Sequence, residues 1–352
     1  MPMNTTEAPQ LRRGWTTGAC ATAALKAALG GLWGAGIPAR VGITLPRGET
    51  PEFAVATQRQ GPGWAEAGVT KDAGDDPDVT HGALIVVRVA ASSGGVVFKA
   101  GEGVGIVTKA GLPVGVGEPA INPVPRAMMQ DVVETLANAH GATGDVEITV
   151  SVPGGAEIAQ KTWNPRLGIV GGLSILGTTG IVRPFSCAAW IASIHRGIDV
   201  ARAEGLTHVA GCTGATSEAA VRAHFHLSEG AMLDMGDFVG GLLKYLRHHP
   251  VERVTIAGGL GKMTKLAQGA RDLHSRRSQV DFALLATWLG DPGVATANSV
   301  LEVHERLGSA LAELIAPRAA ARALDILQPE TAVKLDVILV DRSGAIVAQA
   351  GA

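Results

Sequence analysis

The sequence has few of the residues that mark several common protein classes. Its three cysteines, Cys20, Cys187 and Cys212, are scattered through 352 residues, which argues against a disulfide framework and a cysteine-based zinc site. Charged residues make up 18 % of the chain and the net charge is −2, so no global basic field favours nucleic acid. The uncharged segment 167–182 is shorter than the about 20 residues of a membrane-spanning helix. These shortages favour a cytoplasmic protein that binds neither nucleic acid nor membrane.

An arginine pair near the N-terminus, Arg12-Arg13, precedes a mostly apolar stretch and imitates a secretory signal. Lys26 and several glycines interrupt that stretch, whereas a cleaved signal has a continuous apolar region. We therefore expect an ordinary helix over about residues 19–29, with Thr17 near its N-terminal cap.

Glycine is abundant, at 47 residues or about 13 % of the chain, against roughly 7 % in average proteins. Glycine recurs between Arg166 and Arg183, where no other charge occurs. Each glycine adds backbone freedom that folding must remove. So many glycines therefore predict that the backbone here lies close to another group. A purely structural glycine-rich connection is the alternative. The Thr178-Thr179-Gly180 turn is expected to lead into a helix from Ser186 to about Gly205, and a helix N-terminus beside threonine hydroxyls and an arginine favours anions.

The expected elements fall into two kinds of architecture, and the fold class is predicted as α/β. Strand-like runs at 41–45, 52–57, 68–70 and 83–91, a helix near 124–139 and an alternating strand at 145–152 predict an α+β domain. From about residue 186 helices alternate with strands, which predicts a Rossmann-like α/β domain with a mostly parallel sheet. The predicted boundaries are 11–184 for the first domain, 185–330 for the second, and 331–352 for a C-terminal hairpin of undecided membership.

A glycine turn at 258–262 follows a good strand at 254–257. It is not a phosphate loop, because Met263 stands where Ser or Thr would bind magnesium. Thr264 takes the place of the third glycine of the dinucleotide pattern. A glycine turn at the carboxyl end of a parallel strand still marks a ligand-binding edge in open α/β sheets, with a tight structural turn as the alternative.

The loop from Lys71 to His81 carries four aspartates and one histidine. It does not fit a calcium loop, because the glycine and the terminal glutamate are misplaced. It could be a solvated turn, or it could supply a general base, because clustered carboxylates raise one another's pKa. The acid/base candidates are Asp72, Asp75, Asp78 and His81.

Cations are concentrated in or beside the glycine-rich loops. A substrate with many carboxylates would need scattered arginines and helix N-termini of this kind, although ordinary surface charges are the alternative. The cations concerned are Arg166, Arg183, Lys262, Lys265, Arg271, Arg276 and Arg277.

Several segments, taken in order, resemble the cobalt-precorrin-5B C-methyltransferases of cobalamin biosynthesis, the CbiD family. The resemblance spans roughly residues 11–290 and rests on segments 13–20, 69–82, 101–105, 117–126, 164–186, 235–240 and 261–267. The chain departs at 211–215, where relatives are expected to have Thr-Thr-Gly-Arg, and again at 271–277.

The resemblance implies an S-adenosylmethionine-dependent C-methyltransferase that methylates carbon C-1 of cobalt-precorrin-5B to give cobalt-precorrin-6A. Cobalt then belongs to an anionic tetrapyrrole substrate, and no protein-bound metal is expected. The methyl donor is assigned to the second domain, at Thr213, Gly214, Glu218, Asp237, Gly258, Gly259, Gly261 and Lys262. The substrate is assigned to Thr16, Thr17, Gly18, Lys71, Glu102, Arg126, Arg166, Thr178, Thr179 and Arg183.

Other functions stay open at this point. The alternating second half also suits a dinucleotide-dependent tetrapyrrole reductase, although its glycine fingerprint is incomplete. The same anion sites would serve a non-catalytic tetrapyrrole carrier. A cobalt-free precorrin substrate and a homo-oligomer also remain open.

Overall fold

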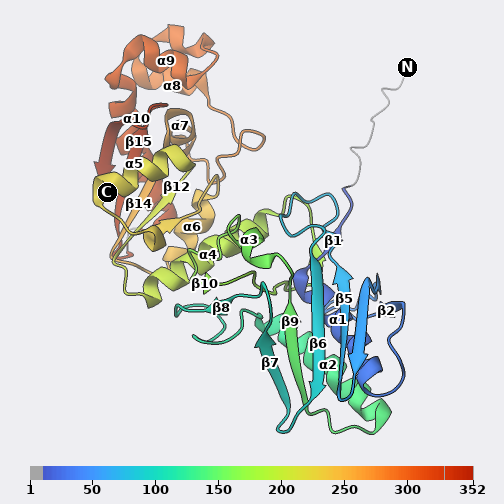
Figure 1. Ribbon diagram of the computed structural model, residues 1–352. Coiled ribbons are helices and arrows are strands. Elements are labelled where there is room, and N and C mark those ends of the chain that lie inside the picture. The colour runs from blue at the N-terminus through green and yellow to red at the C-terminus, as the bar shows by residue number, and fades with distance from the viewer. Residues whose placement is uncertain (1–10, 329, 352) are drawn as a thin grey trace, which may run out of the picture. The chain divides into compact units, whose positions relative to one another are not determined.

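The computed structural model describes residues 11–328 and 330–351. The chain divides into two compact units (Figure 1). Unit 1 ends at Ser186 and unit 2 begins at Cys187.

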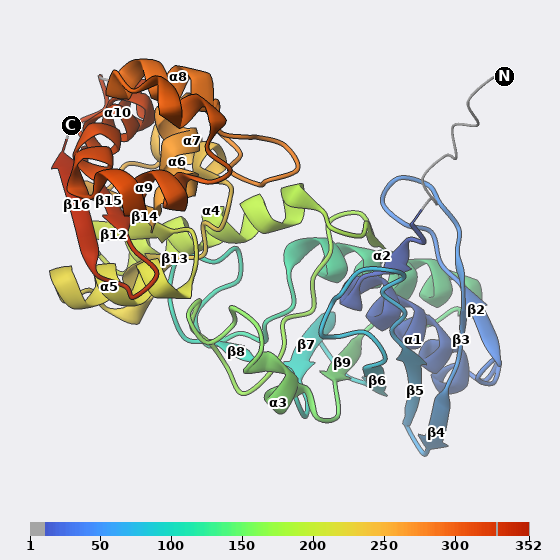
Figure 2. The ribbon, with the colours of Figure 1, turned by 90° about the horizontal axis from the view of Figure 1, so that it is seen from above.

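Unit 1 is built on a five-stranded sheet in the order β4-β5-β6-β9-β7. Its first four strands in that order pair antiparallel, and β7 pairs parallel with β9. Helices α1 and α2 cover one face of this sheet (Figures 1 and 2). The strands are β4 (Thr57–Gly61), β5 (Trp64–Thr70), β6 (Leu84–Ala91), β7 (Val96–Ala100) and β9 (Val146–Ser151).

The two helices of unit 1 follow from local sequence signals. Helix α1 (Thr17–Leu32) is rich in buried alanine, and Thr16 caps it by accepting a hydrogen bond from the Ala19 amide over 3.2 Å. The predicted helix is confirmed, but its cap lies one residue earlier than expected. Helix α2 (Pro123–His140) begins with proline at its first position and ends at Gly141 in the left-handed conformation.

Short paired segments and one short helix complete unit 1. They are β1 (Gly14–Trp15) with β11 (Ile181–Val182), β2 (Arg40–Gly42) with β3 (Glu52–Ala54), β8 (Ile106–Val107) with β10 (Ile169–Val170), and α3 (Gly155–Ala159). The prediction of one strand over 52–57 is wrong, because β3 ends at Ala54 and β4 begins a different sheet at Thr57.

Unit 2 is built on a five-stranded sheet in the order β13-β12-β14-β15-β16. Numbered along the chain, that order is 2-1-3-4-5; the first four strands are parallel and the last is antiparallel. The strands are β12 (His208–Cys212), β13 (Met232–Leu233), β14 (Arg253–Gly259), β15 (Lys334–Val340) and β16 (Ile346–Gly351). The C-terminal hairpin therefore belongs to this sheet, because β15 pairs with β14.

Helices cover both faces of the unit 2 sheet, which explains why its strands are nearly continuous apolar runs. On β15, Val337 and Leu339 face the core shared with α4, α6, α7 and α10, whereas Ile338 and Val340 face α5. The helices are α4 (Cys187–Ala203), α5 (Ala215–Phe225), α6 (Val239–Leu246), α7 (Leu260–Ala267), α8 (Phe282–Leu289), α9 (Val300–Leu307) and α10 (Ser309–Leu327), with short helical turns at Glu229–Ala231 and Pro292–Thr296. The α/β fold class is confirmed.

Candidate functional site

In unit 2 the strand order reverses between β12 and β14. From β12 the chain passes to β13 on one side, and then crosses to β14 on the other side of β12. Open α/β sheets bind ligands at the carboxyl ends of the strands at such a reversal. The segments that leave this edge are Thr213-Gly214 after β12 and Gly259–Lys262 at the end of β14.

Lys262 joins these segments. Its Nζ donates a hydrogen bond to the Thr213 carbonyl oxygen over 3.1 Å and forms an ion pair with Asp237 Oδ1 at 3.0 Å. Asp237 follows β13, so one lysine connects the ends of three neighbouring strands. We call Thr213, Gly214, Asp237, Gly258, Gly259, Gly261 and Lys262 the donor edge, after the methyl donor that the sequence predicts there. Residues that were predicted from three separate segments to bind the donor thus lie together. Glu218, the remaining predicted donor residue, lies in the first turn of α5.

The glycines of the donor edge have different reasons to be glycine. A Cβ at Gly258 would lie 2.6 Å from Thr213 Oγ1, so packing between the loops requires glycine there. A Cβ at Gly214 or Gly261 would meet nothing within 4 Å, and neither residue has the positive φ that favours glycine. At Gly259 the nearest atom would be the Val340 carbonyl oxygen at 4.0 Å. These three glycines leave open space that a close-fitting ligand can use.

In unit 1, three segments that carry predicted substrate or acid/base residues meet at the N-terminus of α1. They are the segment before the helix, the acidic loop 71–81 and the end of the glycine-rich loop 164–183. Backbone hydrogen bonds join them from Trp15 N to Asp72 O (2.7 Å), from Thr16 N to Gly180 O (3.0 Å) and from Gly18 N to Leu176 O (2.9 Å).

The threonines of the three segments that meet at the N-terminus of α1 form hydrogen bonds mainly within the protein. Thr16 is buried and caps α1, and Thr17 Oγ1 accepts a hydrogen bond from the Leu176 amide over 2.9 Å. Thr179 Oγ1 accepts one from the Ile181 amide over 3.3 Å, whereas Thr178 is exposed. A Cβ at Gly18 would lie 2.6 Å from Pro125 Cγ. Thr16, Thr17 and Gly18 therefore shape the loop, and their contact with the substrate stays a prediction.

The glycine-rich loops 101–126 and 164–183 pack on each other. A Cβ at Gly172 would fall into the backbone of Gly103, and one at Gly105 would lie 3.0 Å from the Gly172 carbonyl oxygen. Ile121 and Ile175 form a β-bridge between the same loops. Much of the close approach predicted from the glycine density is therefore an approach between two stretches of protein backbone.

The predicted substrate arginines differ in their surroundings. Arg126 donates to the Ile121 carbonyl oxygen over 2.8 Å and pairs with Glu118 at 2.8 Å, so its guanidinium is used within unit 1. The Arg166 guanidinium lies over the Trp163 ring, 4.5 Å from its centroid. Arg183 is exposed directly after β11, and Glu102 is also exposed.

Two ion pairs hold the acidic loop. Arg12 binds both carboxylate oxygens of Asp72, one of them over 2.9 Å. That hydrogen bonding, together with the Gly74 amide, lowers the pKa of Asp72 to about 2. Burial opposes ionisation of Asp78, but the hydrogen bond and charge of Lys71, 2.7 Å away, outweigh it and lower the pKa of Asp78. The expectation that clustering raises these pKa values is wrong, because each carboxylate has a nearer cation.

The Lys71 side chain is only 1 % exposed and its ammonium forms this internal pair. Its contact with the substrate stays a prediction. Asp75 Oδ2 accepts a hydrogen bond from the Arg12 amide over 2.6 Å. His81 Nδ1 accepts one from the Ala73 amide over 3.1 Å, so the neutral ring carries its proton on Nε2. The His81 side chain is 53 % exposed.

Sequence reasoning missed two residues of this cluster. The sequence presents Arg12 only as part of a signal-like pair, yet its guanidinium lowers the pKa of Asp72. Asp76 was not a candidate, yet its Oδ1 accepts a hydrogen bond from the Phe185 amide over 2.8 Å. Their partners lie 60 and 109 residues away in the chain, so no local pattern signals either contact.

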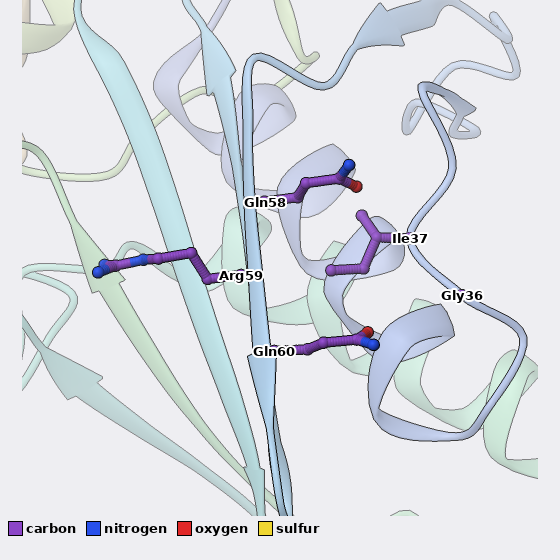
Figure 3. A pocket seen from close by; sticks show the side chains of 5 residues that line it. All are labelled: Gly36, Ile37, Gln58, Arg59 and Gln60. Atoms are coloured by element: carbon purple, nitrogen blue, oxygen red, sulfur yellow. The ribbon is translucent and has the colours of Figure 1, made fainter.

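Unit 1 also has a hollow of about 380 Å³, which lies beyond the C-terminal end of α1 and beside β4. Figure 3 shows Gln58 and Gln60 pointing from β4 towards Ile37, with Arg59 pointing away. The 16 residues of α1 separate this hollow from the acidic loop by about 24 Å, at 1.5 Å per residue. The hollow is therefore not part of the candidate site.

The described part of the chain holds neither a cluster of metal ligands nor a membrane-spanning helix. In residues 11–328 and 330–351, no three His, Cys, Asp or Glu side chains are grouped as a metal site would require. Within the same ranges, no helix has both the length and the apolar character needed to cross a bilayer.

The fold and the donor edge define a class of protein. It is a two-unit α/β protein whose second unit has open, glycine-lined space at the carboxyl edge of a doubly covered sheet, the place where such sheets bind small ligands.

Comparison with known proteins identifies the family. The family model described as CbiD matches residues 4–184. A second family model, described as CbiD, C-terminal domain, matches residues 272–351. The cobalt-precorrin-5B C(1)-methyltransferase of Paramagnetospirillum magneticum is 59 % identical, covering 97 % of this chain and 98 % of the relative. The protein of the same name from Rhodospirillum rubrum is 58 % identical, covering 98 % and 99 %. The chain belongs to the CbiD family.

A solved structure is also similar to this chain. The 1.9 Å crystal structure of the cobalamin biosynthesis protein cbiD from Archaeoglobus fulgidus is 27 % identical, covers 84 % of each chain and has a TM-score of 0.41.

Proposed function

We propose that this protein methylates carbon C-1 of cobalt-precorrin-5B with S-adenosylmethionine, giving cobalt-precorrin-6A in cobalamin biosynthesis. The observation that carries the proposal is the near full-length identity, 57–59 %, with relatives named for this reaction. Cobalt enters as part of the tetrapyrrole substrate.

The methyl donor binds at the donor edge of unit 2, which we interpret as a Rossmann-like sheet. The open space at Gly214, Gly259 and Gly261 supports this placement, because it lies at the strand reversal where doubly wound sheets bind ligands. Asp237 follows β13, the second strand of this sheet along the chain. Doubly wound folds hydrogen-bond ribose hydroxyls from an acidic residue in this position. When bound, S-adenosylmethionine supplies a sulfonium methyl group that a carbon nucleophile can accept.

The tetrapyrrole binds to unit 1 through its glycine-rich loops. Arg183 and Arg166 flank the uncharged loop and bind acetate or propionate arms of the substrate. His81 presents its Nε2–H as a hydrogen-bond donor, because its other ring nitrogen is used by the Ala73 amide. Among the acid/base candidates, Asp72 and Asp78 are poor bases, since cations hold both carboxylates ionised.

We also propose a cytoplasmic location. The three free cysteines of the described chain and the biosynthetic names of the relatives support it.

The test is incubation of the purified protein with cobalt-precorrin-5B and S-adenosylmethionine carrying a deuterated methyl group. We expect the macrocycle to gain one labelled methyl group at C-1, measured by mass spectrometry and carbon NMR. A bound but unchanged tetrapyrrole would show a carrier instead, and a reduced product formed only with a dinucleotide would show a reductase.

A further inference from the structure

The segment from Arg271 to Arg277, which we call the basic loop, lies beside the donor edge and is not used in the function proposed above. It carries Arg271, Arg276 and Arg277 against one acidic residue, Asp272, in a chain whose net charge is −2. All three arginines are exposed.

The backbone of the basic loop is attached to the donor edge. Leu273 N donates a hydrogen bond over 2.8 Å to the carbonyl oxygen of Asp237, whose carboxylate pairs with Lys262. Lys265 Nζ donates to the Leu273 carbonyl oxygen over 3.0 Å, and the Leu273 side chain is fully buried. The centre of the loop is therefore held within one residue of the Asp237–Lys262 pair.

The first residue of the loop is attached in the same way. Gly240 N donates to the Arg271 carbonyl oxygen over 2.9 Å, and a Cβ at Gly240 would lie 2.8 Å from Arg271 Cβ. Glycine at the start of α6 thus permits this close approach. The loop is held in one position before any ligand binds, which lowers the entropy cost of binding.

The arginines of the loop divide into two roles. Arg277 bonds to Asp272 at 2.8 Å and to Cys187 Sγ at 2.9 Å, so it fixes the loop to the start of α4. Within residues 11–328 and 330–351, neither Arg271 nor Arg276 pairs with an acidic side chain. Two exposed arginines therefore precede and follow the buried Leu273, whose amide is hydrogen-bonded to Asp237 of the donor edge.

We infer that Arg271 and Arg276 bind peripheral carboxylates of the tetrapyrrole beside the donor edge. The inference rests on the proposed function and adds a contact on unit 2 that selects an acid-bearing acceptor. Planar guanidinium groups suit carboxylates, which they can bind through two parallel hydrogen bonds.

The test uses uroporphyrin, a macrocycle with acetate and propionate arms, as the probe for binding to the full chain. Arg271→Gln and Arg276→Gln are each expected to weaken uroporphyrin binding about tenfold, as loss of a charge-assisted hydrogen bond does. The lysine variants at the two positions should recover part of the loss. Arg222→Gln, which alters an exposed arginine near the end of α5, is the matched control and should change nothing.

Two further measurements separate the possible outcomes. The affinity for S-adenosylhomocysteine should be unchanged in both glutamine variants, and with cobalt-precorrin-5B the KM should rise while kcat is retained. Unchanged uroporphyrin binding in folded variants would overturn the inference, and so would an equal loss of S-adenosylhomocysteine affinity, which would assign the loop to the donor. If the wild-type protein transfers no methyl group, the proposed function fails, whatever the uroporphyrin titration shows.

Discussion

Arg12 decides the chemical character of the acidic loop. Its guanidinium stabilises the ionised form of Asp72 and lowers the pKa of that carboxyl group to about 2, below the usual value of about 3.9. A carboxyl group that is ionised so readily accepts protons poorly near neutral pH, so Asp72 is better suited to fixing the loop than to catalysis.

The Arg12–Asp72 pair should show itself in the pH dependence of stability. A lowered pKa in the folded state contributes stability that is present above the unfolded pKa and is lost as the pH falls through the folded pKa of about 2. Arg12→Gln should therefore lower the melting temperature at neutral pH, and the difference from wild type should shrink between about pH 4 and 2. Thermal unfolding monitored by circular dichroism across this range measures it. A difference independent of pH would mean that the pair does not control Asp72.

Gly261 tests the donor edge at a single position. Valine there would place a branched side chain in open space, so the fold should tolerate it while the donor loses room. We expect Gly261→Val to weaken S-adenosylhomocysteine binding at least tenfold in calorimetry, with an unchanged melting temperature. Gly42→Val in β2 is the matched control, because a Cβ there would have no neighbour nearer than 3.9 Å and the residue belongs to unit 1. Full affinity in a folded Gly261→Val variant would exclude this donor site.

At the scale of elements, the glycine loops of unit 1 behave as packed structure. Gly172 lies against the backbone of Gly103, and backbone cannot rotate away as a side chain can. Gly172→Ala should lower the free energy of unfolding by roughly 1–3 kcal/mol, the usual cost of overpacking. Urea unfolding measures the change. Gly115→Ala, where the nearest atom would lie 3.8 Å away, is the control and should be close to neutral. Equal effects at both positions would contradict the packing argument.

Arg183 ends the glycine loop as an exposed cation directly after β11. If it binds a substrate carboxylate, Arg183→Ala should weaken uroporphyrin binding by about one decade, the cost of one charge-assisted hydrogen bond. Fluorescence titration measures this affinity, and S-adenosylhomocysteine binding should be untouched. Arg47→Ala, another exposed arginine of unit 1, is the control. A loss of donor affinity with retained uroporphyrin binding would mean that the assignments of donor and tetrapyrrole to the two units are reversed.

For the whole molecule, the proposal assigns one ligand mainly to each unit. Hydrogen exchange of the full chain, followed by mass spectrometry, can locate both ligands in one preparation. S-adenosylhomocysteine should slow exchange in segments 213–218 and 258–262, because ligand contact stabilises local structure against opening. Uroporphyrin should slow exchange in 174–183 and, if the basic loop also binds it, in 271–277. Protection by S-adenosylhomocysteine confined to unit 1 would refute the assignment.

Local signals were sufficient for most elements. The helix expected from Ser186 to Gly205 is α4, the helix near 124–139 is α2, and the strand at 145–152 is β9. Apolar periodicity, caps and glycine stops act over a few residues, so one stretch of sequence contains all of that information. The same locality explains the error at 52–57, where two short strands follow each other but pair with different partners.

The candidate site could be predicted only in part. The glycine turn after a strand and the aspartates of the acidic loop are visible as residue types at given spacings, and they led to the donor and acid/base candidates. The strand order 2-1-3-4-5, the bridge from Lys262 to Thr213 and the packing of Gly172 on Gly103 arise only when distant segments meet. The pKa of Asp72 depends on a charge 60 residues away in the chain, because electrostatic interaction follows distance in space and not separation along the backbone.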